Sequence, residues 1–101
     1  MTLGEADAGS RIGAKVGDVI ELRLAENPTT GFRWTLLPTA AVAIAGDRMD
    51  NAIPAPGAGG MRVLSLQVLQ PGEHQVRLRC ERSWEGEATA VGRFELTLVV
   101  N

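Results

Sequence analysis

Apolar residues recur along this chain with a period of two, not with the 3.6-residue period of a helix. Ile20, Leu22 and Leu24 alternate with polar residues, the pattern of a strand with one face in a core and the other in solvent. The same alternation returns over residues 32–36, 64–68, 76–80 and 94–100. The pattern therefore predicts five half-buried β-strands.

Weaker strand signals lie near residues 11–14 and 48–53. Residues 42–44 are compatible with a strand or a helical turn, because the alanines around them favour helix whereas Val42 and Ile44 favour strand. Turn residues separate these segments, and none combines helix caps with helical periodicity. About seven strands in one chain predict an all-β, immunoglobulin-like β-sandwich of a single domain. A small closed barrel is the alternative.

Length and composition indicate one small folded domain. The chain has 101 residues, of which 45% are hydrophobic and 22% charged, which is too apolar for intrinsic disorder. A formal net charge of −2 supplies no basic field for nucleic acid, and no apolar run reaches the roughly 18 residues of a membrane span. We expect neither nucleic acid nor a membrane as partner, a domain over residues 10–101, and a poorly ordered N-terminal extension over residues 1–9.

The compartment stays open at this point. One cysteine cannot form an internal disulfide, so cysteine usage does not decide between oxidising and reducing surroundings. Residues 1–10 have neither the basic start nor the apolar stretch of a signal peptide. The protein is expected in the periplasm or outside the cell if a signal peptide was removed before residue 1, and in the cytoplasm otherwise.

Reactive residue types do not assemble into a catalytic or metal site. His74 and Cys80 lie on one expected strand and are six residues apart, about 20 Å at ~3.3 Å per residue, so they cannot form a thiol–imidazole dyad. Cys80 is better explained as a small buried apolar residue, and His74 has no suitably spaced zinc co-ligand. The Gly-rich residues 57–60 lack the lysine and the helix of a phosphate-binding loop. We expect a protein that is not an enzyme and holds no cofactor.

Chain reversal between successive strands of a sandwich brings alternate connections to the same end. Three connections, over residues 27–31, 54–60 and 82–90, are therefore expected together. A hairpin at Pro71 and Gly72 is expected at the opposite end. Neighbouring loops on a rigid scaffold commonly form binding surfaces, so the first of these ends is the candidate site.

These three connections have distinctive sequences. Residues 27–32 read Asn-Pro-Thr-Thr-Gly-Phe, an uncharged loop that Pro28 and Gly31 make into a rigid turn. Residues 57–60 read Gly-Ala-Gly-Gly, whose backbone another chain can approach closely. The third contains Arg82-Ser83-Trp84, and Trp84 interrupts the core parity of its strand, so we expect it to be exposed. Tryptophan and arginine are enriched at binding hot spots.

Together the three segments resemble the chagasin-like inhibitors of papain-family cysteine peptidases, the chagasin/ICP family. The motifs of that family are N-P-T-T-G-F, G-x-G-G and R-P-W in the same order, and the similarity runs from about residue 16 to residue 101. The first motif is identical at all six positions. Ser83 replaces the proline of the third motif, which leaves that loop entropically freer before binding.

The resemblance implies a reversible, tight-binding, monomeric inhibitor whose three loops enter the active-site cleft of a papain-like cysteine peptidase. It places Thr29, Thr30 and Gly31 over the catalytic cysteine. It places Gly59 and Gly60 along the non-primed side, and Arg82 and Trp84 on the primed side. No catalytic residue, cofactor or metal is implied. The expected peptidase-binding residues are Asn27, Pro28, Thr29, Thr30, Gly31, Phe32, Gly57, Ala58, Gly59, Gly60, Arg82, Ser83 and Trp84.

Two other readings use the same loop end differently. An immunoglobulin-like adhesion or carbohydrate-binding module would stack Trp84 on a sugar face. A purely structural sandwich domain would tolerate Thr30→Ala and Trp84→Ala without measurable effect. Titration of papain with the protein separates the inhibitor from both.

Overall fold

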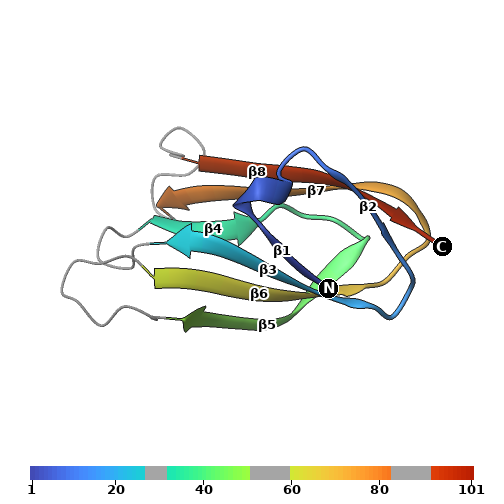
Figure 1. Cartoon of the computed structure of the whole chain (residues 1–101), viewed down its shortest axis with the longest axis horizontal. Coiled ribbons are helices and arrows are strands. Elements are labelled where there is room, and N and C mark those ends of the chain that lie inside the picture. Colours follow the sequence, from blue (N-terminus) through green and yellow to red (C-terminus); the bar gives the residue numbers. More distant parts are fainter. Residues whose placement is uncertain (27–31, 51–59, 83–91) are drawn as a thin grey trace.

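Two four-stranded sheets pack face to face and enclose the core (Figure 1). The structure, a computed structural model, describes residues 1–26, 32–50, 60–82 and 92–101. The first sheet has the order β1 (Thr2–Gly4), β3 (Val19–Glu26), β6 (Gly60–Val68), β5 (Val42–Asp50). The second has the order β2 (Arg11–Ala14), β8 (Gly92–Val100), β7 (Gly72–Arg82), β4 (Phe32–Leu36).

This strand order is that of an immunoglobulin-like sandwich, in which the first, second, fifth and fourth strands form one sheet and the third, sixth and seventh the other. The N-terminal strand is divided into two pieces. β1 pairs in parallel with β3 in the first sheet, and β2 pairs in parallel with β8 in the second. The predicted sandwich is confirmed, and the closed barrel is wrong because the described strands form two separate sheets.

The core contains the inward-facing residues that the sequence alternation identified. Leu22 and Leu64 from the first sheet, and Leu78 and Leu98 from the second, are each 1% exposed or less. Trp34 and Leu36 on β4 are partly buried against the same cluster. Because these side chains come from both sheets, burying them holds the sandwich together.

Val63 is buried although it lies on the outer face of the first sheet. It is 1% exposed and pairs with Arg23 on β3 and with Arg48 on β5. The head of Arg23 binds Asp50 at 2.9 Å and Glu21 at 3.0 Å, so it is held across this face. The aliphatic stems of the two arginines cover Val63 while their charged heads remain at the surface.

The strand expected near residues 48–53 begins earlier than predicted. β5 starts at Val42, so the ambiguous residues 42–44 are strand, and its register with β6 shifts between Ile44 and Gly46. That irregularity, together with exposed alanines on an edge strand, weakened the alternation on which the sequence prediction depended. Residues 51–53 lie outside the described residues.

The N-terminal residues differ from the expectation of a poorly ordered extension over residues 1–9. β1 and a 3₁₀ turn (Glu5–Asp7) occupy this stretch, and Leu3 is 7% exposed. The backbone N–H of Gly4 donates to Asp7 Oδ2 at 2.8 Å, and that of Ala25 on β3 donates to Glu5 Oε1 at 3.1 Å. One buried leucine and a short parallel pairing give too little periodicity to be read from the sequence.

The connection at Pro71 and Gly72 lies at the end expected, but it is not a hairpin. β6 belongs to the first sheet and β7 to the second, so this connection crosses between the sheets. Gly72 has φ of 109°, which favours glycine there. Turn residues alone do not reveal whether the strands they join pair with each other.

Candidate functional site

Six strand ends gather at one end of the sandwich, which we call the loop end (Figure 1). The strand register shows which of these ends are paired with each other. Glu26 lies opposite Gly60, and Phe32 lies opposite Arg82. Cys80 lies opposite Gly92 at the start of β8. The strands that flank all three motif-bearing connections therefore end side by side, as the sequence analysis predicted.

Three of the predicted site residues fall within the described part of the chain. Gly60 and Arg82 occupy the strand ends next to the second and third connections, and Phe32 begins β4. Phe32 is half-buried. The remaining predicted site residues lie outside the described residues: Asn27, Pro28, Thr29, Thr30, Gly31, Gly57, Ala58, Gly59, Ser83 and Trp84.

Glu26, the last residue of β3, is a fully buried carboxylate directly beneath the loop end. Its side chain is 0% exposed. Oε1 accepts a hydrogen bond of 2.7 Å from the backbone N–H of Trp34 on β4, in the other sheet. Oε2 accepts from Arg62 on β6, at 2.9 Å from Nε. Each carboxylate oxygen thus accepts hydrogen bonds from a different strand. A buried charge is stable only when it is paired and hydrogen-bonded in this way.

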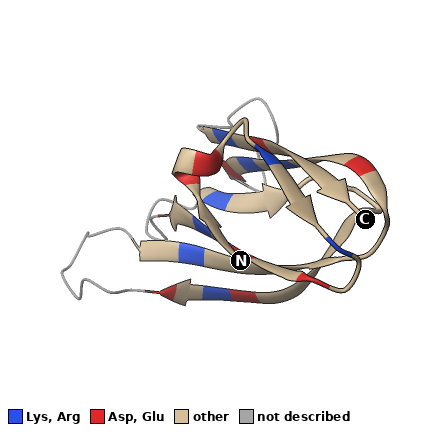
Figure 2. Cartoon of the chain, turned by 45° about the vertical axis from the view of Figure 1, so that its right-hand side comes forward, with Lys and Arg blue, Asp and Glu red and all other residues tan. Residues whose placement is uncertain are grey.

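Arg62 continues this network to β5. Its Nη1 donates to Asp47 Oδ1 at 2.6 Å, and its side chain is 13% exposed. Figure 2 shows charged positions of β5 and β6 near the loop end. Burial lowers the pKa of Arg62, but hydrogen bonds to Glu26 and Asp47 outweigh it, and the net pKa is raised. The guanidinium therefore stays charged.

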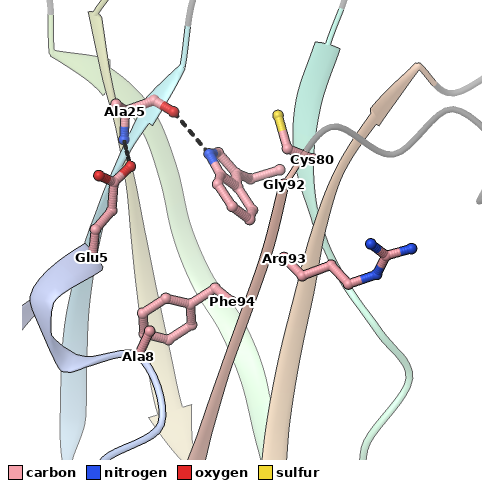
Figure 3. A pocket seen from close by; sticks show the side chains of 8 residues that line it. Glu5, Ala8, Ala25, Cys80, Gly92, Arg93 and Phe94 are labelled. Carbon is pink, nitrogen blue, oxygen red and sulfur yellow. Dashed lines mark hydrogen bonds between the residues drawn. The ribbon is translucent and has the colours of Figure 1, made fainter.

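Trp34 lies against the start of β8, the strand that follows the third connection. Its indole Nε1 donates to the carbonyl oxygen of Ala25 at 2.9 Å, across the gap between the sheets (Figure 3). A Cβ added to Gly92 would lie 3.3 Å from Cη2 of this ring and 3.5 Å from Cβ of Cys80. The indole thus fits against the place where β7 and β8 meet at the loop end.

A cavity of about 390 Å³ opens beside this indole, between the sheets and under the 3₁₀ turn (Figure 3). Small residues make the space, with Ala8, Ala25 and Gly92 in its lining. Cys80 also lines it, and its burial, followed by the negative charge of Glu26, raises the pKa of the thiol above 9.0. Cys80 is 7% exposed, which confirms the interpretation of Cys80 as a buried structural residue, and a thiol whose pKa is raised forms little of the nucleophilic thiolate at neutral pH.

Other reactive groups are also accounted for within the described residues. The ring Nε2 of His74 lies 2.9 Å from the carbonyl oxygen of Pro71, next to the start of β7. No group of three or more metal-ligating side chains occurs among residues 1–26, 32–50, 60–82 and 92–101. In that same part of the chain, no helix has the length and apolarity needed to cross a bilayer.

The sequence analysis missed Glu26 and Arg62, although a signal for them existed. Glu26 continues the inward parity of Leu22 and Leu24, and Arg62 precedes Leu64 with the same parity. Two charges of opposite sign at core positions of different segments predict a buried ion pair. Recognising it required knowing that these two segments are neighbours.

Comparison with known proteins identifies the family. The family model for chagasin family peptidase inhibitor I42 matches residues 13–98. The chain belongs to the chagasin family. It is 30% identical to chagasin of Trypanosoma cruzi over 96% of this chain and 94% of that protein. Members of the family are peptidase inhibitors, so the chagasin-family protein described here is not an enzyme.

Solved structures agree with this assignment. The crystal structure of the cysteine protease inhibitor EhICP2 from Entamoeba histolytica matches the chagasin-family fold seen here with a TM-score of 0.84 and 25% identity, covering 99% of this chain and 94% of that one. The structure of PbICP-C in complex with falcipain-2 matches with a TM-score of 0.69 over 92% of this chain and 88% of that one. At 13% identity the second match shows the shared fold alone.

Proposed function

We propose that this chagasin-family protein inhibits papain-like cysteine peptidases reversibly, by inserting the three connections at the loop end into the active-site cleft. Chagasin and EhICP2 are relatives of this chain, and EhICP2 is described as a cysteine protease inhibitor. PbICP-C is described in complex with falcipain-2. The observation that carries the proposal is that the strands flanking all three motifs end together.

The proposed binding surface has three parts. Residues 27–32 form the central wedge over the catalytic cysteine, where Thr29, Thr30 and Gly31 lie against the thiol. Gly57, Ala58, Gly59 and Gly60 approach the non-primed side through their backbone. Arg82, Ser83 and Trp84 form the third part on the primed side. Such an interface needs about 800 Å² from each partner, which is adequate for nanomolar binding when it contains good hot spots.

The composition of the first connection supports a wedge that resists cleavage. It is uncharged, so few groups lose hydration on entering the cleft. Pro28 fixes one backbone dihedral in advance, which lowers the ordering cost, and Gly31 permits a left-handed turn, so that together they hold the peptide bonds of this connection away from the geometry of attack. Prolonged incubation with papain, followed by mass spectrometry, should therefore find no nick near Thr30.

Active-site titration of papain tests the function directly. Increasing amounts of the protein are added to a fixed concentration of papain, and residual activity is followed with a fluorogenic peptide. The expected result is a linear loss of activity that ends at one inhibitor per enzyme and is reversed on dilution. Undiminished activity at a large molar excess would contradict the proposal, and retention on a glycan array would then favour the carbohydrate-binding module.

A further inference from the structure

The two strands that flank residues 27–31 belong to different sheets. β3 lies in the first sheet and β4 in the second, so no β-ladder joins them. Among the residues that the structure describes, two hydrogen bonds cross the gap at this point, from the Trp34 backbone to Glu26 and from the Trp34 indole to Ala25. One glutamate and one tryptophan therefore hold together the strands that carry the proposed central wedge.

The same glutamate is bound to the strands that carry the second connection. Its Oε2 is held by Arg62, two residues after Gly60, and Arg62 reaches Asp47 on β5. β5 and β6 are the strands before and after residues 51–59. A displacement of Glu26 thus changes the position of β6 relative to β4, and not only the end of β3.

Trp34 extends the connection to the third pair of strands. The backbone of Trp34 is fixed by Glu26 Oε1, and its ring lies against Gly92 at the start of β8. In the pairing of β4 with β7, Trp34 lies opposite Cys80, near the end of β7. Moving Trp34 would therefore move the ring that lies against the start of β8.

We propose that Glu26 is a positioning residue of the inhibitor, which fixes the placement of the three connections relative to one another through Trp34 and Arg62. The inference rests on the proposed function, because placement matters for affinity only if the connections together form the binding surface. The side chain of Glu26 is buried, so it offers no surface to a partner. Its effect on binding is exerted through the strands it joins.

The carboxylate is well suited to this role because it is an acceptor only, on both oxygens. Within the described residues, the groups that hydrogen-bond to it are both donors, namely a backbone N–H and the guanidinium of Arg62. In Glu26→Gln one oxygen becomes an NH₂ group that points its protons at a donor. Either the contact with Trp34 or the contact with Arg62 is then lost.

A neutral pair can restore the geometry without the charge. In the double variant Glu26→Gln/Arg62→Gln, the amide introduced at position 62 ends as many bonds from its backbone as Nε of Arg62 does. Its oxygen can accept from the amide introduced at position 26, whose own oxygen still accepts from Trp34. The double variant therefore distinguishes loss of the bridge from mere loss of charge.

The experiment measures the inhibition constant and the association and dissociation rate constants for papain, with the melting temperature of each variant. Glu26→Gln and Arg62→Gln are each expected to raise the inhibition constant about tenfold or more, mainly through faster dissociation. The double variant is expected to return to within about threefold of the parent protein. Trp34→Phe, which removes the indole N–H and the part of the ring that lies against Gly92 but keeps the backbone N–H, is expected to raise the constant severalfold.

Two matched controls separate positioning from general stability. Val68→Ala removes a buried side chain at the opposite end of β6, where the exposed fraction is 1%. It should lower the melting temperature without changing the inhibition constant measured well below that temperature. Arg77→Gln removes an exposed ion pair with Glu95 on the second sheet and should change neither quantity.

The possible outcomes are distinct. If the parent protein titrates papain but Glu26→Gln changes the inhibition constant no more than Val68→Ala does, the positioning role is disproved and the inhibitor function stands. A double variant as weak as Glu26→Gln alone also disproves it. If Glu26→Gln does not fold, Arg62→Gln, whose shorter side chain breaks the link from Glu26 to Asp47 on β5, decides by the same comparison. Failure of the parent protein to inhibit papain disproves the proposed function itself.

Discussion

The indole of Trp34 packs so closely on Gly92 that an added Cβ would lie 3.3 Å from ring atom Cη2 and 3.6 Å from Cζ2. Contacts this short require one partner to move. The ring is restrained because its Nε1–H is bonded to Ala25 of the other sheet. Gly92, which begins the strand after the third connection, therefore packs against a ring that β4 carries and that a hydrogen bond to β3 holds in place.

Gly92→Ala is expected to lower the free energy of unfolding by about 1 kcal/mol, since overpacking displaces the ring or lengthens its hydrogen bond. Urea unfolding followed by circular dichroism measures the change. Gly13→Ala is the control, because no atom lies within 4 Å of the Cβ it would introduce on β2. Equal stability losses in the two variants would contradict the contact described.

Trp84→Ala is expected to weaken the binding of papain by about 2 kcal/mol or more, as for an aromatic hot spot, while the melting temperature stays nearly unchanged. Thr30→Ala should likewise weaken binding. The inhibition constant and a thermal melt are measured on the same preparations. A melting temperature that falls while inhibition is retained would show that Trp84 fills a local core and does not contact the peptidase.

Arg23→Ala is expected to lower the melting temperature, because it uncovers Val63 on the outer face of the first sheet. Hydrogen bonds to Asp50 and then Glu21 raise the pKa of Arg23, so its head is charged at all ordinary pH values. Arg23→Met keeps an aliphatic stem without the ion pairs. If coverage of Val63 dominates, the melting temperature of Arg23→Met should lie close to that of the parent protein. Equal decreases in melting temperature for Arg23→Ala and Arg23→Met would assign the stability to the ion pairs.

The thiol of Cys80 should make stability depend on alkaline pH. Burial, and next the charge of Glu26, raises its pKa in the folded protein above the 9.0 of an unperturbed thiol. The folded state therefore holds the proton more tightly, and this stabilisation is complete below about pH 9 and is lost as pH rises toward the folded pKa. Urea unfolding at pH 8 and pH 10 in reductant should show a larger fall for the parent protein than for Cys80→Ala. Identical falls in the two proteins would contradict the raised pKa.

Much of the fold could be predicted from local pattern. The alternation in residues 20–24, 64–68, 76–80 and 94–100 identified strands that the structure places in β3, β6, β7 and β8. β2 also coincides with residues 11–14. Where the pattern was weak the prediction was incomplete, as at β1, which depends on one buried leucine, and at β5, whose register shifts between Ile44 and Gly46.

The candidate site could likewise be predicted only in part from the sequence. Its three motifs are contiguous stretches, so the family, the chemistry of the proposed binding residues and the gathering of their strands at one end followed from the sequence. The buried bridge of Glu26, Arg62 and Trp34 did not, although each of the three has inward parity on its own strand.

The sequence by itself determined which residues face the core and which segments carry the family motifs, because both are encoded by neighbours one or two positions apart. Only the tertiary structure decided that β3 and β4 belong to different sheets and that a carboxylate must close the gap between them. The physical reason is that a buried charge is stable only where donors from distant segments converge on it, and that convergence exists only after the sheets have packed.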